Sequence, residues 1–441
     1  MPIKVGMVSL GCSKNQVDAE HLLFDLKQAG FELCVDSGEC DVVVINTCGF
    51  IEAAKREAIE NILEFAELKK EGRIKVIAVT GCLAERYREE LEKELPEADI
   101  VLGIGSNNEL VDAINRALNG EKTVMFGEKE NLALEGGRII SNLPFYAYIK
   151  IAEGCNNRCA YCAIPQIRGN YRSRKIENIL EEARFFAENG VSELIVVAQD
   201  TTMYGTDLYG EKKLPELLNK MCEIDGVKQI RLLYAYPDKI TDELIDTIAN
   251  QPKIVKYLDI PFQHVSENVL RKMNRPGNKE SALALVKKLR SRVPGIILRT
   301  TLMTGFPGET EKDFEELCEF MDEVQFERLG CFAFSPEENT PAADMPDQID
   351  DEIKERRADL IMTKQMTVIE NFNQKQIGKT LETVVEGYDK YAGSFFGRSA
   401  YDAPDIDSKV FFSSDKLLSI GDYVDVLITD CMEYDLIGET V

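Results

Sequence analysis

Short runs of β-branched and apolar residues alternate with helical patterns along most of this chain, and that alternation constrains the fold more than any other feature. In the first part of the chain, strand-like runs cover residues 3–10, 41–47 and 74–80. Helical patterns follow them at residues 15–29, 51–69 and 84–93. Such alternation builds a parallel sheet with helices on its faces. We therefore predict an α/β domain over residues 1–120.

Each of these three strands leads to a cysteine that stands beside a glycine. The cysteines are Cys12, Cys48 and Cys82. Because the carboxyl ends of parallel strands lie at one edge of a sheet, we expect the three side chains to gather there. A free cysteine is often only a small buried hydrophobe, but three at equivalent strand ends indicate a shared site. We predict that they bind one metal cluster.

A second strand–helix alternation follows the first. Residues 121–142 are charged and contain glycine, which predicts a linker. Over residues 143–375, candidate strands cover residues 146–151, 193–198, 229–234, 257–260, 295–303 and 328–334. Candidate helices cover residues 176–189, 214–221, 241–248, 266–273, 279–293 and 311–323. This pattern predicts a partial parallel barrel of the TIM type, with its site at the carboxyl ends of the strands.

The last segment, residues 376–441, changes in character. Its β-rich runs are separated by turn residues and cover residues 380–385, 392–399, 409–412 and 423–429. This pattern predicts a small antiparallel β-barrel of OB-like size. The segment holds thirteen acidic and five basic residues, a net charge of −8 within −25 for the whole chain. Phosphate recognition relies on Lys and Arg, so an electropositive protein is the better predicted partner.

Three more cysteines follow the first strand of the second alternation. Cys155, Cys159 and Cys162 have the spacing C-x3-C-x2-C, with no fourth cysteine nearby in sequence. Closed zinc and iron–sulfur sites usually take four ligands, which disfavours a zinc site here. Three ligands indicate a cluster with one open corner, where substrate chemistry can occur.

The compartment follows from the cysteines and from the absence of an export signal. Residues 9–12 resemble a lipoprotein cleavage site, but the apolar stretch before them is too short for a signal peptide. The chain contains no run of about 18 apolar residues, so we expect no membrane-spanning helix. Twelve cysteines in such a chain indicate a reducing compartment. We expect a cytoplasmic protein.

Several residues near the predicted strand ends are candidates for cofactor binding. They are Tyr161, Gln199, Asp200, Gly305 and Glu309. Tyr161 is a candidate for a contact with that cofactor, with simple packing as the alternative. The glycine loop before Glu309 could be interpreted as a phosphate cradle, but it lacks that consensus. We interpret it as a bend at a strand end near the cofactor.

The two histidines and one basic run have simpler interpretations. We expect His264 to be a hydrogen-bonded residue of the barrel mouth and His21 to be structural. The basic run is Arg168, Arg172, Arg174 and Lys175. It could meet nucleic acid, bind a cofactor carboxylate or form a solvated face, and the solvated face is favoured.

The C-x3-C-x2-C motif at the mouth of a predicted barrel resembles the signature of radical S-adenosylmethionine enzymes. The resemblance implies that Cys155, Cys159 and Cys162 bind a 4Fe-4S cluster. It also implies that the methionine part of S-adenosylmethionine chelates the fourth iron, and that reduction of the cluster produces a 5′-deoxyadenosyl radical. Thiolate ligation is consistent with a low-potential cluster.

The whole chain, with its N-terminal cysteine sheet, radical barrel and terminal TRAM-like barrel, is similar to the methylthiotransferase family. The resemblance implies that Cys12, Cys48 and Cys82 bind a second 4Fe-4S cluster, which holds the sulfur to be transferred. It further implies two S-adenosylmethionine molecules per product. One methylates the sulfur, and the other provides the radical that removes a hydrogen from the substrate carbon.

Two branches of this family differ in substrate. One modifies an adenosine in transfer RNA, and the other, the RimO type, modifies the β-carbon of an aspartate in small-subunit ribosomal protein twelve. Residues 197–205, 334–340 and 398–407 resemble the second branch, although Asn339 stands where its pattern has glycine. The first branch typically carries Gln-Asn in place of Gln199-Asp200 and a more basic terminal barrel.

We therefore expect a ribosomal-protein methylthiotransferase that meets nucleic acid only indirectly. Its electron donor would be a protein such as a flavodoxin. The alternatives are a transfer-RNA adenosine methylthiotransferase and an iron–sulfur scaffold protein without radical chemistry.

Overall fold

A computed structural model describes residues 2–441 of the chain, which divide into two compact units. The first unit consists of Met1–Ser141, Ala152–Arg174 and Ser335–Thr340. The second consists of Asn142–Ile151, Lys175–Phe334 and Pro341–Val441. Among the residues that the structure describes, no helix is both long enough and apolar enough to cross a membrane.

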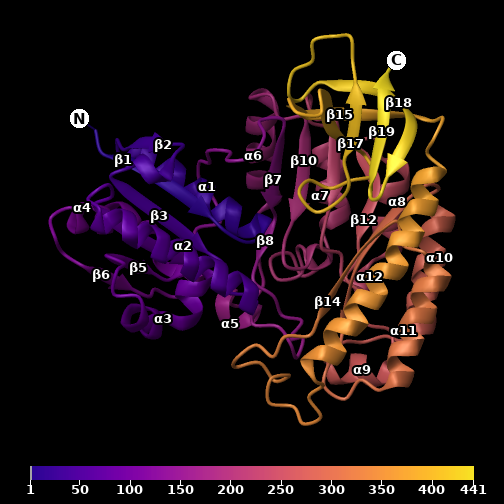
Figure 1. The fold of residues 1–441 in the computed structure, drawn as a ribbon, viewed down its shortest axis with the longest axis horizontal. Helices are drawn as coiled ribbons and strands as arrows, with labels where there is room; N and C mark the ends of the chain where they lie inside the picture. The colour runs from indigo at the N-terminus through magenta and orange to yellow at the C-terminus, as the bar shows by residue number, and fades with distance from the viewer. Residues whose placement is uncertain (1) are drawn as a thin grey trace. The chain divides into compact units, whose positions relative to one another are not determined.

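The first unit is built on a six-stranded parallel sheet with the strand order β2-β1-β3-β4-β5-β6 (Figure 1). Its strands are β1 (Lys4–Ser9), β2 (Glu32–Cys34), β3 (Val42–Thr47), β4 (Val76–Gly81), β5 (Ile100–Leu102) and β6 (Thr123–Met125). Its longer helices are α1 (Ser13–Gln28), α2 (Glu52–Lys70), α3 (Cys82–Glu94) and α4 (Leu110–Ala117). The predicted α/β sheet is confirmed. The strands β2, β5 and β6 were not predicted, and β6 lies in the stretch expected to be a linker.

The sheet of the first unit is covered on both faces because side chains alternate along each strand. On one face, Val43 and Ile45 of β3 pack with Ile62 of α2 and Leu83 of α3. On the other, Val44 packs in the core that includes side chains of α1 and α4. Both β3 and β4 are buried along their whole length, and each begins with four apolar residues, as expected of parallel strands covered on both faces.

The second unit contains a six-stranded parallel sheet whose strands lie in sequence order and whose two edges, β7 and β14, stay open. The strands are β7 (Tyr146–Lys150), β10 (Glu193–Val197), β11 (Gln229–Leu232), β12 (Ile254–Asp259), β13 (Ile297–Thr304) and β14 (Arg328–Ala333). Its helices include α6 (Ile176–Glu188), α7 (Leu214–Cys222), α8 (Asp242–Asn250), α9 (Glu267–Lys272), α10 (Lys279–Arg292) and α11 (Glu311–Val324). All six strands were predicted, and the partial barrel is confirmed.

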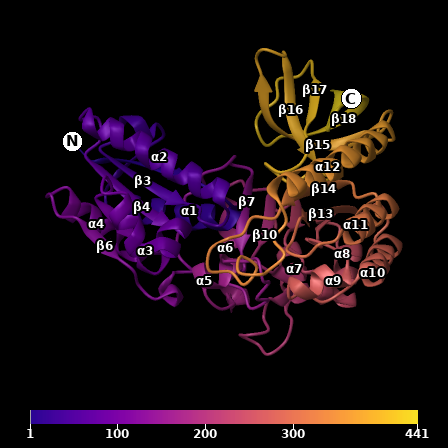
Figure 2. The same ribbon diagram turned by 60° about the horizontal axis from the view of Figure 1, so that its bottom comes forward.

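A long helix, α12 (Asp351–Gln374), was not predicted. It packs on β13 and β14 and reaches β18 of the terminal barrel, as Figure 2 shows. Its buried residues include Arg357, Ile361 and Gln365, so one face of the helix is mixed in polarity rather than uniformly apolar. That mixture weakens the periodic apolar signal on which helix prediction depends.

The terminal β-barrel of the second unit is closed, with the strand order β15-β16-β17-β19-β18. The strands are β15 (Thr380–Asp389), β16 (Ser394–Ser399), β17 (Val410–Ser413), β18 (Tyr423–Met432) and β19 (Asp435–Thr440). The prediction of a purely antiparallel barrel is wrong in one pair, because β17 and β19 run parallel. The strand β19 was not predicted, and it provides the partner through which the barrel closes.

Residues 398–407, the segment that joins β16 to β17, fix the terminal barrel to the strands of the partial barrel. We call this stretch the foot segment. Arg398 and Arg231 of β11 both bind the fully buried carboxylate of Glu193 on β10. Arg328 of β14 donates to Asp402 at 2.9 Å. Further along, Tyr257 of β12 donates to Asp407 at 2.6 Å. Four strands thus hold this segment through buried polar contacts.

We expect Arg328→Met to lower the stability of the second unit by about 3–5 kcal/mol, because it leaves the buried carboxylate of Asp402 without its cation. The double variant Arg328→Met/Asp402→Asn should recover part of that loss. Arg292→Met, which breaks an exposed ion pair with Asp242, should change little. Urea unfolding midpoints measure all three, and equal midpoints for the two single variants would contradict this interpretation.

Candidate functional site

The structure brings Cys12, Cys48 and Cys82 to one edge of the first unit's sheet, as predicted. Cys12 caps the amino end of α1, Cys48 directly follows β3, and Cys82 begins α3. Their strands β1, β3 and β4 are parallel neighbours, so the loops that carry the cysteines are adjacent. Cys48 and Cys82 are buried, whereas Cys12 is exposed as a residue although its sulfur is desolvated.

Gly11 allows the first two loops to approach each other closely. It has φ of +92°, and a Cβ atom added there would lie 2.8 Å from the Cys48 sulfur. A side chain at this position would therefore displace Cys48 as well as strain the backbone. The glycine beside Cys12 is explained by this contact with a second cysteine.

The three thiols have different protonation chemistry. Burial raises the pKa of Cys48 and raises that of Cys82 to about 12, and neighbouring thiolates add to both shifts. The sulfur of Cys12 is also desolvated, but the charges of Lys14 and Arg168 hold its pKa below the usual value. Metal binding to such a set must release protons from the two buried thiols.

The chemistry of these donors suits an iron–sulfur cluster, for which thiolates are the usual ligands. Within residues 2–441, no group of three or more His, Cys, Asp or Glu side chains is arranged to bind a single metal ion. The three thiols lie on three separate loops around one sheet edge. Such loops can carry one cysteine each to a cluster.

The second cysteine triplet lies in the loop between β8 (Ala152–Glu153) and α5 (Ile164–Arg168). The loop is closed at its base, where β8 pairs with β9 (Arg172–Ser173) and the Cys155 amide donates to the Gly169 carbonyl at 3.2 Å. The Cys162 amide donates to the Cys159 carbonyl at 3.0 Å, which tightens the turn between them. Tyr161 is half-buried in this turn. The pairing of β8 with β9 therefore gives the loop of the second triplet a fixed base.

Arg168 and Arg174 are buried, so the expectation of a solvated basic face is wrong for both. Arg174 pairs with Glu135 at 2.5 Å, and Arg168 pairs with Asp18 and Glu153. Arg172 is half-buried and donates to the Glu130 carbonyl at 2.7 Å. Sequence neighbours of like charge suggested a solvent-exposed face, but each arginine has a separate acceptor.

Residues 335–340 contain a further contact near the cysteines of the first unit, which sequence reasoning missed. Glu337 is buried and accepts from the Glu52 amide at 3.0 Å and from Arg86 at 2.9 Å. Arg86 in turn donates to the carbonyl of Gly49, next to Cys48, at 2.8 Å. Glu337 thus supports the loop of one cysteine through Arg86.

Asn339 occupies the position where the family pattern has glycine, and the backbone explains the exchange. Its φ is +61°, in the left-handed region. After glycine, asparagine and aspartate tolerate this region best. The departure from the pattern therefore preserves the conformation of the loop.

In the second unit, Gln199 and Asp200 directly follow β10, as predicted. Gln199 is half-buried, whereas Asp200 is 1% exposed. One Asp200 oxygen accepts from the Thr202 amide at 3.0 Å, and the other lies 3.9 Å from the Lys239 ammonium. The carboxylate of Asp200 therefore shapes the turn after the strand and keeps one oxygen near a cation.

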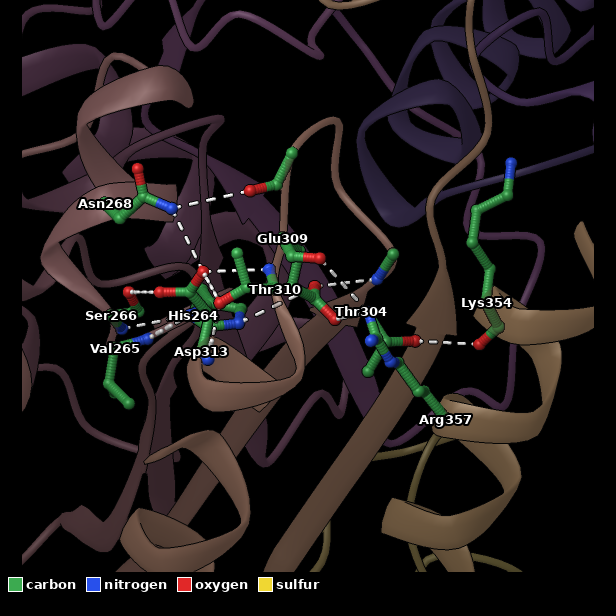
Figure 3. Close-up of polar contacts among 12 residues, drawn as sticks. His264, Val265, Ser266, Asn268, Thr304, Glu309, Thr310, Asp313, Lys354 and Arg357 are labelled. Carbon is green, nitrogen blue, oxygen red and sulfur yellow. Dashed lines mark hydrogen bonds and ion pairs between the residues drawn. The ribbon is translucent and has the colours of Figure 1, made fainter. Parts of the chain in front are cut away.

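The side chain of Glu309 contacts Gly305, the first residue of the loop after β13. Figure 3 shows Glu309 beside Arg357 of α12. The Gly305 amide donates to one Glu309 oxygen, and Arg357 donates to the other, both at 2.7 Å. Gly305 has φ of +73°, and an added Cβ would lie 1.9 Å from a Lys354 side-chain carbon. Burial raises the pKa of Glu309 to about 7, although Arg357 opposes the shift. Glu309 thus holds the bend that the sequence predicted.

His264 is a hydrogen-bonded histidine, as expected. Its Nδ1 accepts from the amides of Val265 and Ser266, both at 3.0 Å (Figure 3). The proton therefore lies on Nε2, which is 3.7 Å from a Glu309 oxygen. Burial lowers the pKa of His264 to about 3, so the ring is neutral near pH 7.

We expect the unaltered protein to lose stability relative to His264→Gln as the pH is lowered below 6.5. The reason is that the imidazole takes up a proton in the unfolded chain but not in the folded one. The slope can reach about 1.4 kcal/mol per pH unit. Glu309 has the opposite dependence, but both proteins contain it, so its effect largely cancels. Melting temperatures at about pH 7.5 and about pH 5 measure the gap, with His21→Gln as the control. A gap that does not change with pH would contradict the prediction.

The candidate residues therefore fall into two groups. Both cysteine triplets and Tyr161 belong to the first unit, whereas Gln199, Asp200, Gly305 and Glu309 belong to the second. Within the first unit, α5 joins the two triplets, because Ala163 and Ile167 are buried with Cys82 in one small apolar cluster.

Comparisons with known proteins match three regions of the chain. Residues 4–103 match the uncharacterized protein family UPF0004, residues 149–321 the radical SAM superfamily and residues 377–441 the TRAM domain. The chain is 47% identical to a protein of Clostridium tetani over 99% of this chain and 98% of the relative. It is 48% identical to a protein of Desulforamulus reducens over 99% of both chains. It is also 48% identical to a protein of Clostridioides difficile, over 100% of this chain and 99% of the relative. All three are named ribosomal protein uS12 methylthiotransferase RimO.

Solved structures support the fold. The radical S-adenosylmethionine methyltransferase TsrM from Kitasatospora setae, with cobalamin and a [4Fe-4S] cluster bound, aligns with a TM-score of 0.59. Its sequence is 15% identical, and the alignment covers 78% of this chain and 74% of that one. The cobalamin-dependent radical enzyme OxsB aligns with a TM-score of 0.52 at 13% identity, over 83% of this chain and 58% of that one. At these identities the likeness concerns the fold alone.

Proposed function

The chain belongs to the RimO family of ribosomal protein uS12 methylthiotransferases, and we propose that it adds a methylthio group to the β-carbon of an aspartate in uS12. The observation that carries the proposal is the joining of two groups of three cysteines within one compact unit. The relatives named above are uS12 methylthiotransferases. Their name favours uS12 over the alternative, a transfer-RNA adenosine.

We assign one 4Fe-4S cluster to Cys155, Cys159 and Cys162 and a second to Cys12, Cys48 and Cys82. When bound, these groups supply the electron that cleaves S-adenosylmethionine and the sulfur that is transferred. The protein's own part is to hold six thiolates on loops with fixed bases. The proposed domains are residues 1–120, 143–375 and 376–441, with 121–142 between the first two.

We assign S-adenosylmethionine contacts to Tyr161, Gln199, Asp200 and Gly305, and we assign to Glu309 the support of the Gly305 backbone beside that cofactor. In support, Gln199 and Asp200 lie just past the carboxyl end of β10, where the sites of parallel α/β sheets gather. Glu309 has both oxygens engaged by Gly305 and Arg357. Its contribution is therefore to position the Gly305 backbone rather than to bind the cofactor directly.

We assign recruitment of the substrate to the terminal barrel. Exposed acids cover its surface, at Glu382, Asp405, Asp415, Asp422, Asp425, Asp430, Glu433 and Glu439. A groove of about 560 Å³ on the barrel has Phe411, Met432 and Ile437 in its lining and Glu439 beside them. Because ribosomal proteins are basic, an acidic surface with an apolar groove suits a segment of uS12 better than it suits phosphate.

We expect Asp430→Lys/Glu433→Lys/Glu439→Lys to raise the KM for uS12 about tenfold, because attraction between opposite charges speeds encounter. Release of 5′-deoxyadenosine without substrate should not change. The matched control is Glu352→Lys/Glu355→Lys/Asp359→Lys, which reverses three exposed acids on α12. The effect should shrink at high salt, and an unchanged KM for the triple variant would contradict recruitment by the barrel.

The proposed reaction can be tested with purified protein. The protein would be reconstituted with iron and sulfide, reduced, and incubated with S-adenosylmethionine and uS12 or small ribosomal subunits. We expect a uS12 peptide that carries a methylthio group in place of one aspartate hydrogen. Release of 5′-deoxyadenosine without any change in uS12 would contradict the substrate. In the cell, we place the protein in the cytoplasm with an electron donor such as a flavodoxin.

A further inference from the structure

Arg168 lies at the centre of a buried polar network in the first unit, between the two cysteine triplets. Its side chain is 2% exposed. It pairs with Asp18 of α1 and lies 3.3 Å from Glu153, two residues before Cys155. It also donates to the Cys82 sulfur at 3.1 Å. One guanidinium thus connects a ligand of one proposed cluster to the base of the loop that carries the other.

The same guanidinium reaches the remaining two loops through Asn15. Arg168 donates to the Asn15 side-chain oxygen at 3.0 Å. The Asn15 amide nitrogen donates to the Leu10 carbonyl at 2.8 Å and lies 3.3 Å from the Thr47 carbonyl. Leu10 lies two residues before Cys12, and Thr47 directly precedes Cys48. The network therefore touches all three loops that carry the sheet-edge cysteines.

The helix α5 gives this network a rigid support. It begins at Ile164, two residues after Cys162, and ends at Arg168. Ile167 and Ala163 are fully buried and pack with Cys82. Arg168 is therefore held by packing on one side and by carboxylates on the other, so its position is determined before any cluster binds.

We propose that Arg168 is a positioning residue of the cluster held by Cys12, Cys48 and Cys82, and that it raises the reduction potential of that cluster. This inference rests on the proposed second cluster. Hydrogen bonds to sulfur and the local net charge set the potential of an iron–sulfur cluster. Reduction adds negative charge, and a buried cation beside a ligand sulfur stabilises the reduced state. The Arg168 guanidinium is such a cation, in contact with the Cys82 sulfur.

The test uses a full-length parent variant, Cys155→Ala/Cys159→Ala/Cys162→Ala, which leaves only the sheet-edge cluster site. Arg168→Gln and Arg168→Lys are added to this parent, with Arg172→Gln as the matched control from the same basic run. Arg172 donates to backbone carbonyls and not to a cysteine. Iron and sulfide per chain and the midpoint potential, followed by electron paramagnetic resonance, are measured for each protein.

We expect Arg168→Gln to move the midpoint potential to a more negative value and to lower the retained iron. Arg168→Lys should give a smaller shift in the same direction, because it keeps the charge and loses the planar fork. Arg172→Gln should match the parent. If Arg168→Gln does not fold, Arg168→Lys decides.

Equal potentials, line shapes and iron contents for the Arg168 variants and the Arg172 control would overturn the inference. A parent variant without iron would contradict the second cluster itself, and the inference with it. The two failures are distinguishable, because the first leaves an intact cluster in the parent and the second leaves none.

Discussion

Replacing Cys155, Cys159 and Cys162 with alanine should reduce the release of 5′-deoxyadenosine to the level of a protein-free blank. These residues are the proposed ligands of the cluster that reduces S-adenosylmethionine. Without the three thiolates the protein cannot hold that cluster. Chromatography of the reduced reaction mixture measures the nucleoside. The uS12 product should disappear with it.

The control for this variant is Cys222→Ala/Cys318→Ala, which removes two half-buried cysteines of the second unit. It should release the nucleoside at the rate of the unaltered protein. If the triple variant also kept that rate, the cluster assigned to these three cysteines would not be the group that cleaves S-adenosylmethionine. The iron–sulfur scaffold alternative predicts no release from any of these proteins, including the unaltered one.

Replacing Cys12, Cys48 and Cys82 with alanine should have a different effect. We expect loss of about half the iron and complete loss of methylthio transfer to uS12. Release of 5′-deoxyadenosine should continue, because the other triplet has its own loop with a base closed by the β8–β9 pair. Iron analysis, nucleoside release and mass spectrometry of uS12 are measured on the same preparation.

Cys34→Ala serves as the control for the second triplet, since Cys34 ends the short strand β2 opposite Gly6 of β1 and not in the loops that carry the three cysteines. Its thiol donates to the Asp36 carbonyl at 3.1 Å. Unchanged iron in the triple variant would contradict the second cluster. Simultaneous loss of all iron would also contradict two separate clusters.

Local patterns made much of the fold predictable. The strands β3 and β4 are fully buried, each begins with four apolar residues, and each leads directly to a cysteine. The position of these cysteines at the carboxyl edge of a parallel sheet follows from strand–helix alternation alone. The strands β2, β5 and β6 each span three residues, which is too short for periodicity to show.

The polar networks around the cysteines could not be predicted, because their partners are distant in sequence. Arg168 and Asp18 lie 150 residues apart, and Glu337 meets the Glu52 amide across 285 residues. Charged residues are usually exposed, so a basic run suggests a solvated surface. Only the fold reveals that Arg168 is buried beside carboxylates and a cysteine sulfur. The glycine pattern was similarly misleading at Asn339, whose left-handed backbone is invisible in sequence.

The central claim is that this chain methylthiolates an aspartate of uS12 and not an adenosine of transfer RNA. Mass spectrometry of uS12 and of digested transfer RNA from a strain lacking the gene, with and without a restored copy, tests it most directly. We predict that the methylthio mass on the uS12 aspartate disappears with the gene and returns with the copy, while the nucleosides stay unchanged. Loss of a methylthio nucleoside with uS12 still modified would contradict the claim.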